Sequence, residues 1–116
     1  MSAELTPAFI TWLEHQRRRG SVALAKIADQ RRLLLGEAHG LERFAIRMAL
    51  VNLTGLVAGW ARGVHEGLSE AGHEQAAAAF ALSPPFAESD PTTEDCERLG
   101  EYVEERVKLL EDLLAA

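Results

Sequence analysis

A chain of 116 residues has the length of one domain, and we treat residues 1–116 as a single domain with its own core. The 47% hydrophobic and 26% charged residues are ordinary values for a globular protein, and they argue against disorder. The single cysteine, Cys96, excludes an intramolecular disulfide and is typical of a reducing compartment. The first residues contain no basic segment followed by an apolar run, so we expect no signal peptide and a cytoplasmic location.

The charge is divided unevenly along the chain. The net charge is −6, but residues 1–63 carry nine basic and five acidic residues, a net +4. Residues 64–116 carry three basic and thirteen acidic residues, a net −10. Such an asymmetry indicates either a surface for nucleic acid or head-to-tail electrostatic association between copies.

The first 36 residues predict two short helices separated by a glycine. Thr6 followed by Pro7 is a helix start, because threonine can cap the helix and proline at the first position loses nothing by lacking an N–H group. We expect this helix to end at Gly20. Ser21 then caps a second amphipathic helix that runs to about Leu35.

The third predicted helix, from about Leu41 to His65, is the longest and the most apolar. A helix that is apolar on most of its circumference is expected to be buried on most sides, so we predict that it forms the centre of the bundle. One narrow polar window, about 40° wide at 100° per residue, contains four side chains. They are Arg43, Arg47, Thr54 and His65.

Another side of the same predicted helix carries glycines spaced four residues apart. Gly55, Gly59 and Gly63 would let a neighbouring helix approach closely. Such spacing is familiar from membrane helices, but Arg47 and Asn52 lie inside an apolar run that barely reaches spanning length. We therefore expect no membrane insertion.

The second half of the chain predicts two more helices on either side of a loop. A weaker helix is expected over residues 70–82, and the proline-rich segment SPPFAESDPTTED, which starts at Ser83, is expected to be a loop. The last helix should run from Pro91 or Thr93 to Leu114, with an apolar stripe on one side and carboxylates on the other. The sequence thus predicts an all-α fold, a compact bundle of about five helices around a long central apolar helix.

Few residues suggest catalysis or metal binding. No phosphate-binding glycine loop, nucleophile elbow or paired-cysteine zinc spacing is present, so we expect no enzyme activity and no cofactor. Cys96 lies on the apolar stripe of the last helix and is interpreted as a buried, inert thiol. Glu70 and His73 form a Glu-x-x-His pair as in di-iron bundles, but the inward carboxylates that such a centre needs from facing helices are missing.

The basic residues of the first half are the candidate functional set. Guanidinium groups held in a row on a rigid helix suit phosphate oxygens, and Arg43 and Arg47 lie one turn apart. Because few aromatic residues lie between the basic ones, we expect sequence-independent contact with a nucleic-acid backbone. The alternative is that the arginines meet the acidic last helix, within one chain or in a neighbouring copy. The candidate phosphate contacts are Arg17, Arg18, Arg19, Lys26, Arg31, Arg32, Arg43 and Arg47.

Two segments carry a family resemblance. Residues 9–34 read FITWLEHQRRRGSVALAKIADQRRLL, an aromatic-rich helix ending in a glycine, then a small-residue helix and paired arginines; residues 47–60 read RMALVNLTGLVAGW. This pattern resembles the small α-helical subunits of CRISPR effector complexes, over roughly residues 9–60. Longer members of that family have a further C-terminal helical bundle, so the resemblance is to a compact variant.

The resemblance implies a non-enzymatic subunit of an RNA-guided antiviral complex. Such subunits stack on copies of themselves and on larger subunits, and they hold guide RNA or single-stranded target DNA through basic surface residues. Two alternatives stay open: a helical protein–protein interaction module that binds no nucleic acid, and a metal-binding oligomer built on Glu70 and His73.

Overall fold

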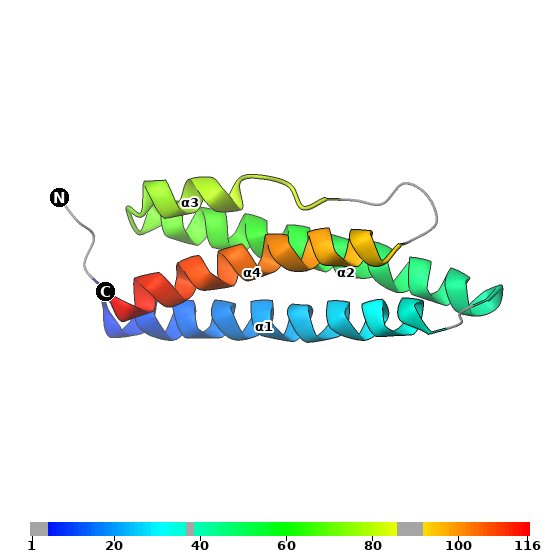
Figure 1. The fold of residues 1–116 in the computed structure, drawn as a ribbon. Coiled ribbons are helices and arrows are strands. Elements are labelled where there is room, and N and C mark those ends of the chain that lie inside the picture. Colours follow the sequence, from blue (N-terminus) through cyan, green and yellow to red (C-terminus); the bar gives the residue numbers. More distant parts are fainter. Residues whose placement is uncertain (1–4, 37–38, 86–91) are drawn as a thin grey trace.

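The computed structural model describes residues 5–36, 39–85 and 92–116, and these residues form four helices and no strand. The helices are α1 (Pro7–Leu35), α2 (Leu41–Glu70), α3 (Glu74–Phe80) and α4 (Thr93–Ala115) (Figure 1). The all-α prediction is confirmed, with one helix fewer than expected. The molecule is a rod of 55 × 21 × 17 Å, and its radius of gyration of 15.7 Å exceeds the value of about 13 Å typical of a compact domain of this length.

The N-terminal helix begins as predicted but does not end at Gly20. Phe9 N–H donates to Thr6 Oγ1 at 3.1 Å, and Pro7 occupies the first helical position. Helix α1 then continues for 29 residues to Leu35. The predicted break is wrong because Gly20 is a contact point between helices: a Cβ atom there would lie 2.5 Å from Val107 Cγ2 and 2.9 Å from Trp60 Cζ2.

Helix α2 begins where predicted and runs five residues beyond His65, through Glu70. A turn follows, in which Gly72 adopts a φ of 86° and His73 N–H donates to Leu68 O at 2.8 Å. A positive φ ends a helix and favours glycine. The helix predicted over residues 70–82 is therefore shortened to the seven residues of α3.

Helix α4 begins and ends within a residue or two of the prediction. Thr92 and Asp95 form a capping box, in which Asp95 N–H donates to Thr92 Oγ1 at 3.2 Å and Thr92 N–H donates to Asp95 Oδ2 at 2.8 Å. The apolar stripe predicted for this helix is buried, from Cys96 to Leu110. Residues 83–85 extend without a helix, as the predicted loop requires, while residues 86–91 of that loop lie outside the described residues.

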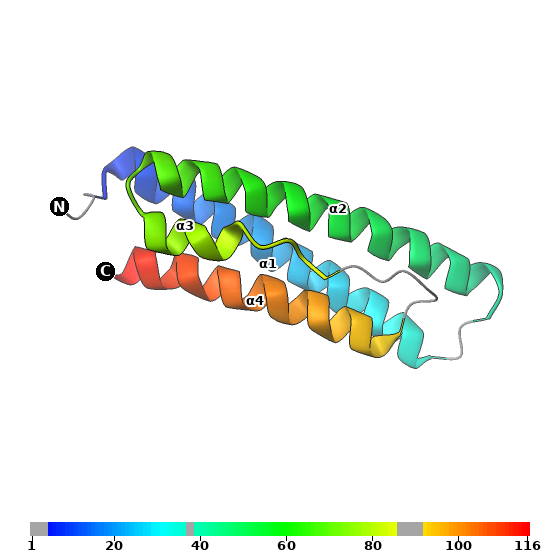
Figure 2. The ribbon, with the colours of Figure 1, turned by 90° about the horizontal axis from the view of Figure 1, so that it is seen from above.

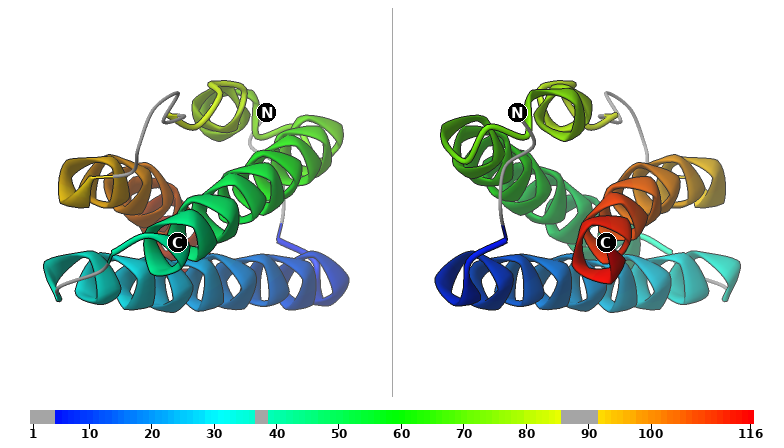
Figure 3. Two further views of the ribbon diagram at one scale, coloured as in Figure 1. Left: turned by 90° about the vertical axis from the view of Figure 1, so that its right-hand side faces the viewer. Right: turned by 90° about the vertical axis from the view of Figure 1, so that its left-hand side faces the viewer.

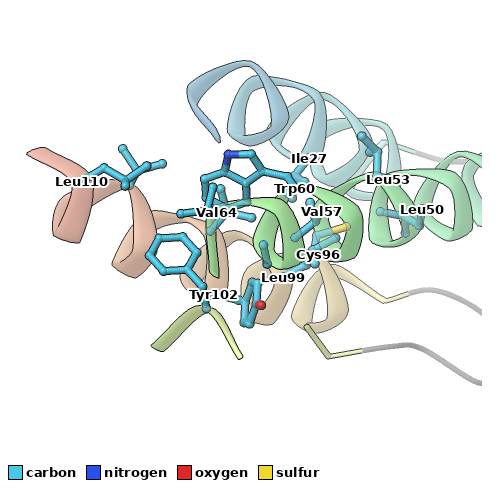
Figure 4. Packing of buried hydrophobic residues seen from close by; sticks show 14 of the residues in the cluster. Ile27, Leu50, Leu53, Val57, Trp60, Val64, Cys96, Leu99, Tyr102 and Leu110 are labelled. Atoms are coloured by element: carbon cyan, nitrogen blue, oxygen red, sulfur yellow. The ribbon is translucent and has the colours of Figure 1, made fainter. Parts of the chain in front are cut away.

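The four helices form a bundle in which α1 and α4 make the most extensive pair. They run antiparallel, so the C-terminus lies near the start of α1, and α3 returns beside the C-terminal half of α2 (Figures 1 and 2). Seen from its ends, the bundle has α2 inclined to α1, with α3 on top (Figure 3). The core lies between α1, α2 and α4: Trp60 and Val64 of α2 point toward Ile27 of α1 and Leu110 of α4 (Figure 4).

The prediction that α2 is a hub buried on most sides is wrong. Helix α2 makes few contacts with α4, and its buried residues follow one side of the helix. One hydrogen bond fixes its crossing with α1: Trp60 Nε1 donates to Gln16 O at 3.0 Å. The apolar composition of α2 reflects two faces, one that enters the core and one that faces outward.

Candidate functional site

Three of the eight predicted phosphate contacts share one exposed side of α1. Arg18, Arg19 and Lys26 are exposed and line a hollow between α1 and α2, together with His15. Arg17 lies on the opposite side of α1, about 170° around the helix axis from this group. The sequence motif RRR therefore supplies two basic side chains to this surface and one to another.

Arg31 and Arg32 are engaged within the chain. Nε and Nη2 of Arg31 both donate to Glu97 Oε1 of α4, at 3.2 and 2.9 Å. Arg32 pairs with Asp29, one turn earlier on α1. Arg31 thus meets the acidic last helix inside one chain.

Arg43 and Arg47 do not lie beside the α1 group. Both are on α2, where Arg43 is half-buried and Arg47 is exposed. At 100° per residue they lie about 110° around the axis of α2 from the residues that line the hollow. The eight candidates therefore form at least two separate surfaces.

The hollow between α1 and α2 has a volume of about 390 Å³ and an apolar lining. Val22 and Ala23 of α1 face Leu56, Val57 and Trp60 of α2 across it. The basic side chains stand at its edge. An apolar lining with basic side chains at the edge matches a ligand or partner side chain that is apolar and carries an anionic group at one end.

The outward face of α2 is the largest feature that the sequence analysis did not predict. Four large apolar side chains are exposed along it, and Leu41 and Phe44 keep 85% and 60% of their surface in contact with solvent. Gly55, Gly59 and Gly63 lie on the same side, where an added Cβ atom would meet no atom within 4 Å. Among the described residues, no helix packs against these glycines. The exposed residues are Leu41, Phe44, Met48 and Val51. Leu56 is also exposed, but it lies at the hollow between α1 and α2.

The sequence does show the apolar residues of this face, but their pattern predicted a face buried in the core. Between residues 41 and 61 the charged residues are Glu42, Arg43 and Arg47, and none of them lies on the outward side of the helix. A helix that is apolar on two opposite sides is expected to pack each side against other apolar residues. Periodicity alone does not say whether that neighbour belongs to the same chain.

The Glu-x-x-His pair lacks the geometry that metal binding requires. Glu70 is the last residue of α2 and His73 lies in the turn before α3, so the two do not share a helical face. The His73 ring stacks on Phe9 at 5.3 Å between ring centroids, and its Nε2 is buried without a hydrogen-bond partner. No group of three or more metal-ligating side chains occurs among the residues that the structure describes.

Cys96 and Arg106 have structural roles. Cys96 is buried, as predicted. Burial, and then the neighbouring Asp95 carboxylate, raise the pKa of its thiol. Arg106 was missed by sequence reasoning because it lies on an acidic helix. Arg106 is 5% exposed, and its guanidinium lies over the Tyr102 ring at 3.4 Å and donates to Ala79 O at 3.0 Å.

Comparison with known proteins gives this chain no relative. No protein-family model, curated protein or solved structure matches it. Helix α2 is long and apolar enough to cross a membrane by length and composition, and 33% of its most apolar segment is buried in the bundle. The resemblance to small CRISPR subunits stays a prediction.

Proposed function

We propose that this protein is a non-enzymatic helical subunit that assembles with other protein chains through the outward face of α2. The observation that carries the proposal is the row of four exposed apolar side chains from Leu41 to Val51, uninterrupted by charge. Soluble monomers rarely expose a contiguous apolar patch larger than a few hundred Å², and larger patches mark interaction sites. Full burial of a large apolar side chain contributes about 1.5–3 kcal/mol, and covering these side chains gains the share that their exposed fractions, from 37% to 85%, represent.

A charge placed on this face tests the proposal. Phe44 is 60% exposed, so Phe44→Glu leaves the core intact and is expected to abolish assembly by burying an unpaired carboxylate. Leu82→Glu is the matched control, because Leu82 is 65% exposed but lies after α3, away from this face. Each tagged variant is purified from cells that express the native complex, and the mass of the assembly purified with it is measured by mass photometry. Identical assemblies from native and Phe44→Glu chains would overturn the proposal.

A second candidate function is backbone-only binding of RNA or single-stranded DNA, as the CRISPR resemblance implies. The specific observation in its favour is that Arg18, Arg19 and Lys26 share one exposed side of α1 beside the hollow. In this proposal the chain is a cytoplasmic subunit of an RNA-guided complex, it contacts larger subunits through α2, and α1 follows phosphates. Phosphate contacts release counterions, which makes affinity fall steeply with salt.

The second candidate is tested by reversing the charges on α1. The triple variant Arg18→Glu, Arg19→Glu and Lys26→Glu should lose retention of labelled single-stranded RNA, and three phosphate contacts predict a log–log salt slope of about −2 for the native chain. Arg32→Glu is the control, because Arg32 pairs with Asp29 and lies outside the group. Equal retention by the triple variant and the native chain would contradict nucleic-acid binding at this surface.

A further inference from the structure

The outward face of α2 carries the spacing of a two-helix seam. Its apolar and small residues alternate at intervals of three and four, the a and d positions of a heptad repeat. The residues are Leu41, Phe44, Met48, Val51, Gly55 and Ala58. Four of the six are exposed large side chains, Gly55 is exposed, and Ala58 is half-buried. This spacing keeps the apolar residues of one helix facing a neighbouring helix over the full length of the pair.

The seam changes in size from one end to the other. Its N-terminal half, Leu41 to Met48, consists of large side chains, and its C-terminal half, Val51 to Ala58, of smaller ones. In an antiparallel pair of such helices each large residue lies opposite a small one. In a parallel pair Phe44 would meet Phe44 and Gly55 would meet Gly55, which produces a clash at one layer and a void at another.

We infer that the occupant of this face is a second copy of the chain, bound antiparallel through α2 about a two-fold axis. This inference rests on the proposed assembly function and names its partner. The register follows from the size gradient. Opposed across the axis are Leu41 and Ala58, Phe44 and Gly55, and Met48 and Val51.

The space that this register needs is present in the single chain. An added Cβ atom at Gly55 would meet nothing within 4 Å, so the Phe44 ring of the second copy has room above that glycine. The contact is isologous, since each copy offers the same residues, and it closes as a dimer without leaving a free end. Head-to-tail stacking, by contrast, would leave one seam exposed on each terminal copy.

The flanks of the seam fit the same register. One flank carries Arg47 and Thr54, and the other carries Ala45 and Asn52. Antiparallel pairing sets Arg47 opposite Thr54 of the second copy, so the arginines do not repel each other. From Leu41 to Ala58 the seam is about 27 Å long.

Disulfide trapping tests directly which residues of the two α2 helices lie opposite each other. Phe44→Cys and Gly55→Cys are each made in the full chain, and the unsubstituted chain is the control because its Cys96 is buried. Neither variant alone should form a disulfide dimer, since 11 residues, about 16 Å of helix, separate each cysteine from its own counterpart. An equal mixture of the two should form one under mild oxidation. Dimers from Phe44→Cys alone would overturn the antiparallel register.

A second pair of variants separates dimerisation from folding. Gly55→Leu fills the space for Phe44, while Gly63→Leu adds the same side chain at an equally open glycine outside the seam. By sedimentation equilibrium, the native chain and Gly63→Leu should reach twice the 12.7 kDa of one chain, and Gly55→Leu should stay at 12.7 kDa with undiminished helicity. A native chain that is monomeric at every concentration overturns the inference.

The remaining outcomes distinguish this inference from the function on which it rests. If the native chain is monomeric but Phe44→Glu still loses a subunit of its native complex, another protein occupies the face, and only the second-copy inference fails. If Phe44→Glu keeps the same native assembly, both fail. Flotation of the native chain with phospholipid vesicles, lost in Phe44→Glu, would assign the face to a membrane and would overturn both.

Discussion

Two helical glycines of this protein have opposite surroundings. At Gly20 a Cβ atom would clash with Val107 and Trp60, whereas at Gly63 it would meet no atom within 4 Å. We expect Gly20→Ala to lower the free energy of unfolding by about 1–3 kcal/mol through overpacking. Gly63→Ala should raise it by about 0.5–1 kcal/mol, because alanine loses less backbone entropy in a helix. Urea unfolding followed by circular dichroism measures both, and equal shifts would contradict the packing role of Gly20.

At the scale of elements, α3 and the turn that follows it are attached by side chains that bind their backbone carbonyl groups. A helix of seven residues is too short to be stable alone, so its helicity depends on its neighbours. Arg106 Nε donates to Ala79 O at 3.0 Å, and the Tyr102 hydroxyl donates to Leu82 O at 2.5 Å. His65 Nδ1 lies 2.8 Å from Ala77 O. The last turn of α3 is therefore held from both α2 and α4.

Removing one of these donors should loosen α3 without unfolding the bundle. Arg106→Met keeps much of the buried volume but leaves Ala79 O without its partner, which costs about 1–3 kcal/mol. We expect faster hydrogen exchange across residues 74–80, measured by mass spectrometry, with slow exchange retained in the middle of α4. Lys108→Met, an exposed change on the same helix, is the control. Unchanged exchange in α3 would show that Arg106 does not hold it.

The starts of α1 and α4 were predictable from sequence because their causes are local. Thr6 with Pro7, and Thr92 with Asp95, act within four residues, and the stripe of α4 needs only its own periodicity. The break at Gly20 was mispredicted because its role depends on residues 40 and 87 positions later in the chain, Trp60 and Val107. Tertiary packing of this kind overrides helix propensity.

The candidate surfaces were predictable only in part, for a related reason. The positions of Arg18, Arg19 and Lys26 on one side of α1 follow from helical spacing. That Arg31 turns to Glu97 does not, because the pair joins residues 66 positions apart. An apolar stripe likewise indicates that a helix face is buried, but it does not indicate whether the burying residues belong to the same chain or to another one. The outward face of α2 was therefore interpreted as part of the core.

At the scale of the whole molecule, the uneven charge of the sequence is brought together by the fold. Helix α1, from the basic half, packs along α4, from the acidic half, and this is the most extensive helix pair in the bundle. The Arg31–Glu97 bridge crosses it, but both side chains are about half exposed, and such surface pairs contribute at most about 1 kcal/mol. The asymmetry is thus partly matched within one chain, while Arg18, Arg19 and Lys26 stay at the surface.

A dimer formed through α2 has a consequence for the stability of the whole molecule. When folding is linked to self-association, a tenfold rise in chain concentration adds about 1.4 kcal/mol to the free energy of unfolding per dimer. For two chains of this size that corresponds to a few degrees in the unfolding midpoint, Tm. We expect the Tm of the native chain and of Gly63→Leu to rise by that amount per tenfold concentration, measured by differential scanning calorimetry. The Tm of Gly55→Leu should not change with concentration, because its seam cannot close while its core, on the opposite side of α2, is untouched. A concentration-independent Tm for the native chain would place all of its stability in the single bundle and would leave the α2 seam to another partner.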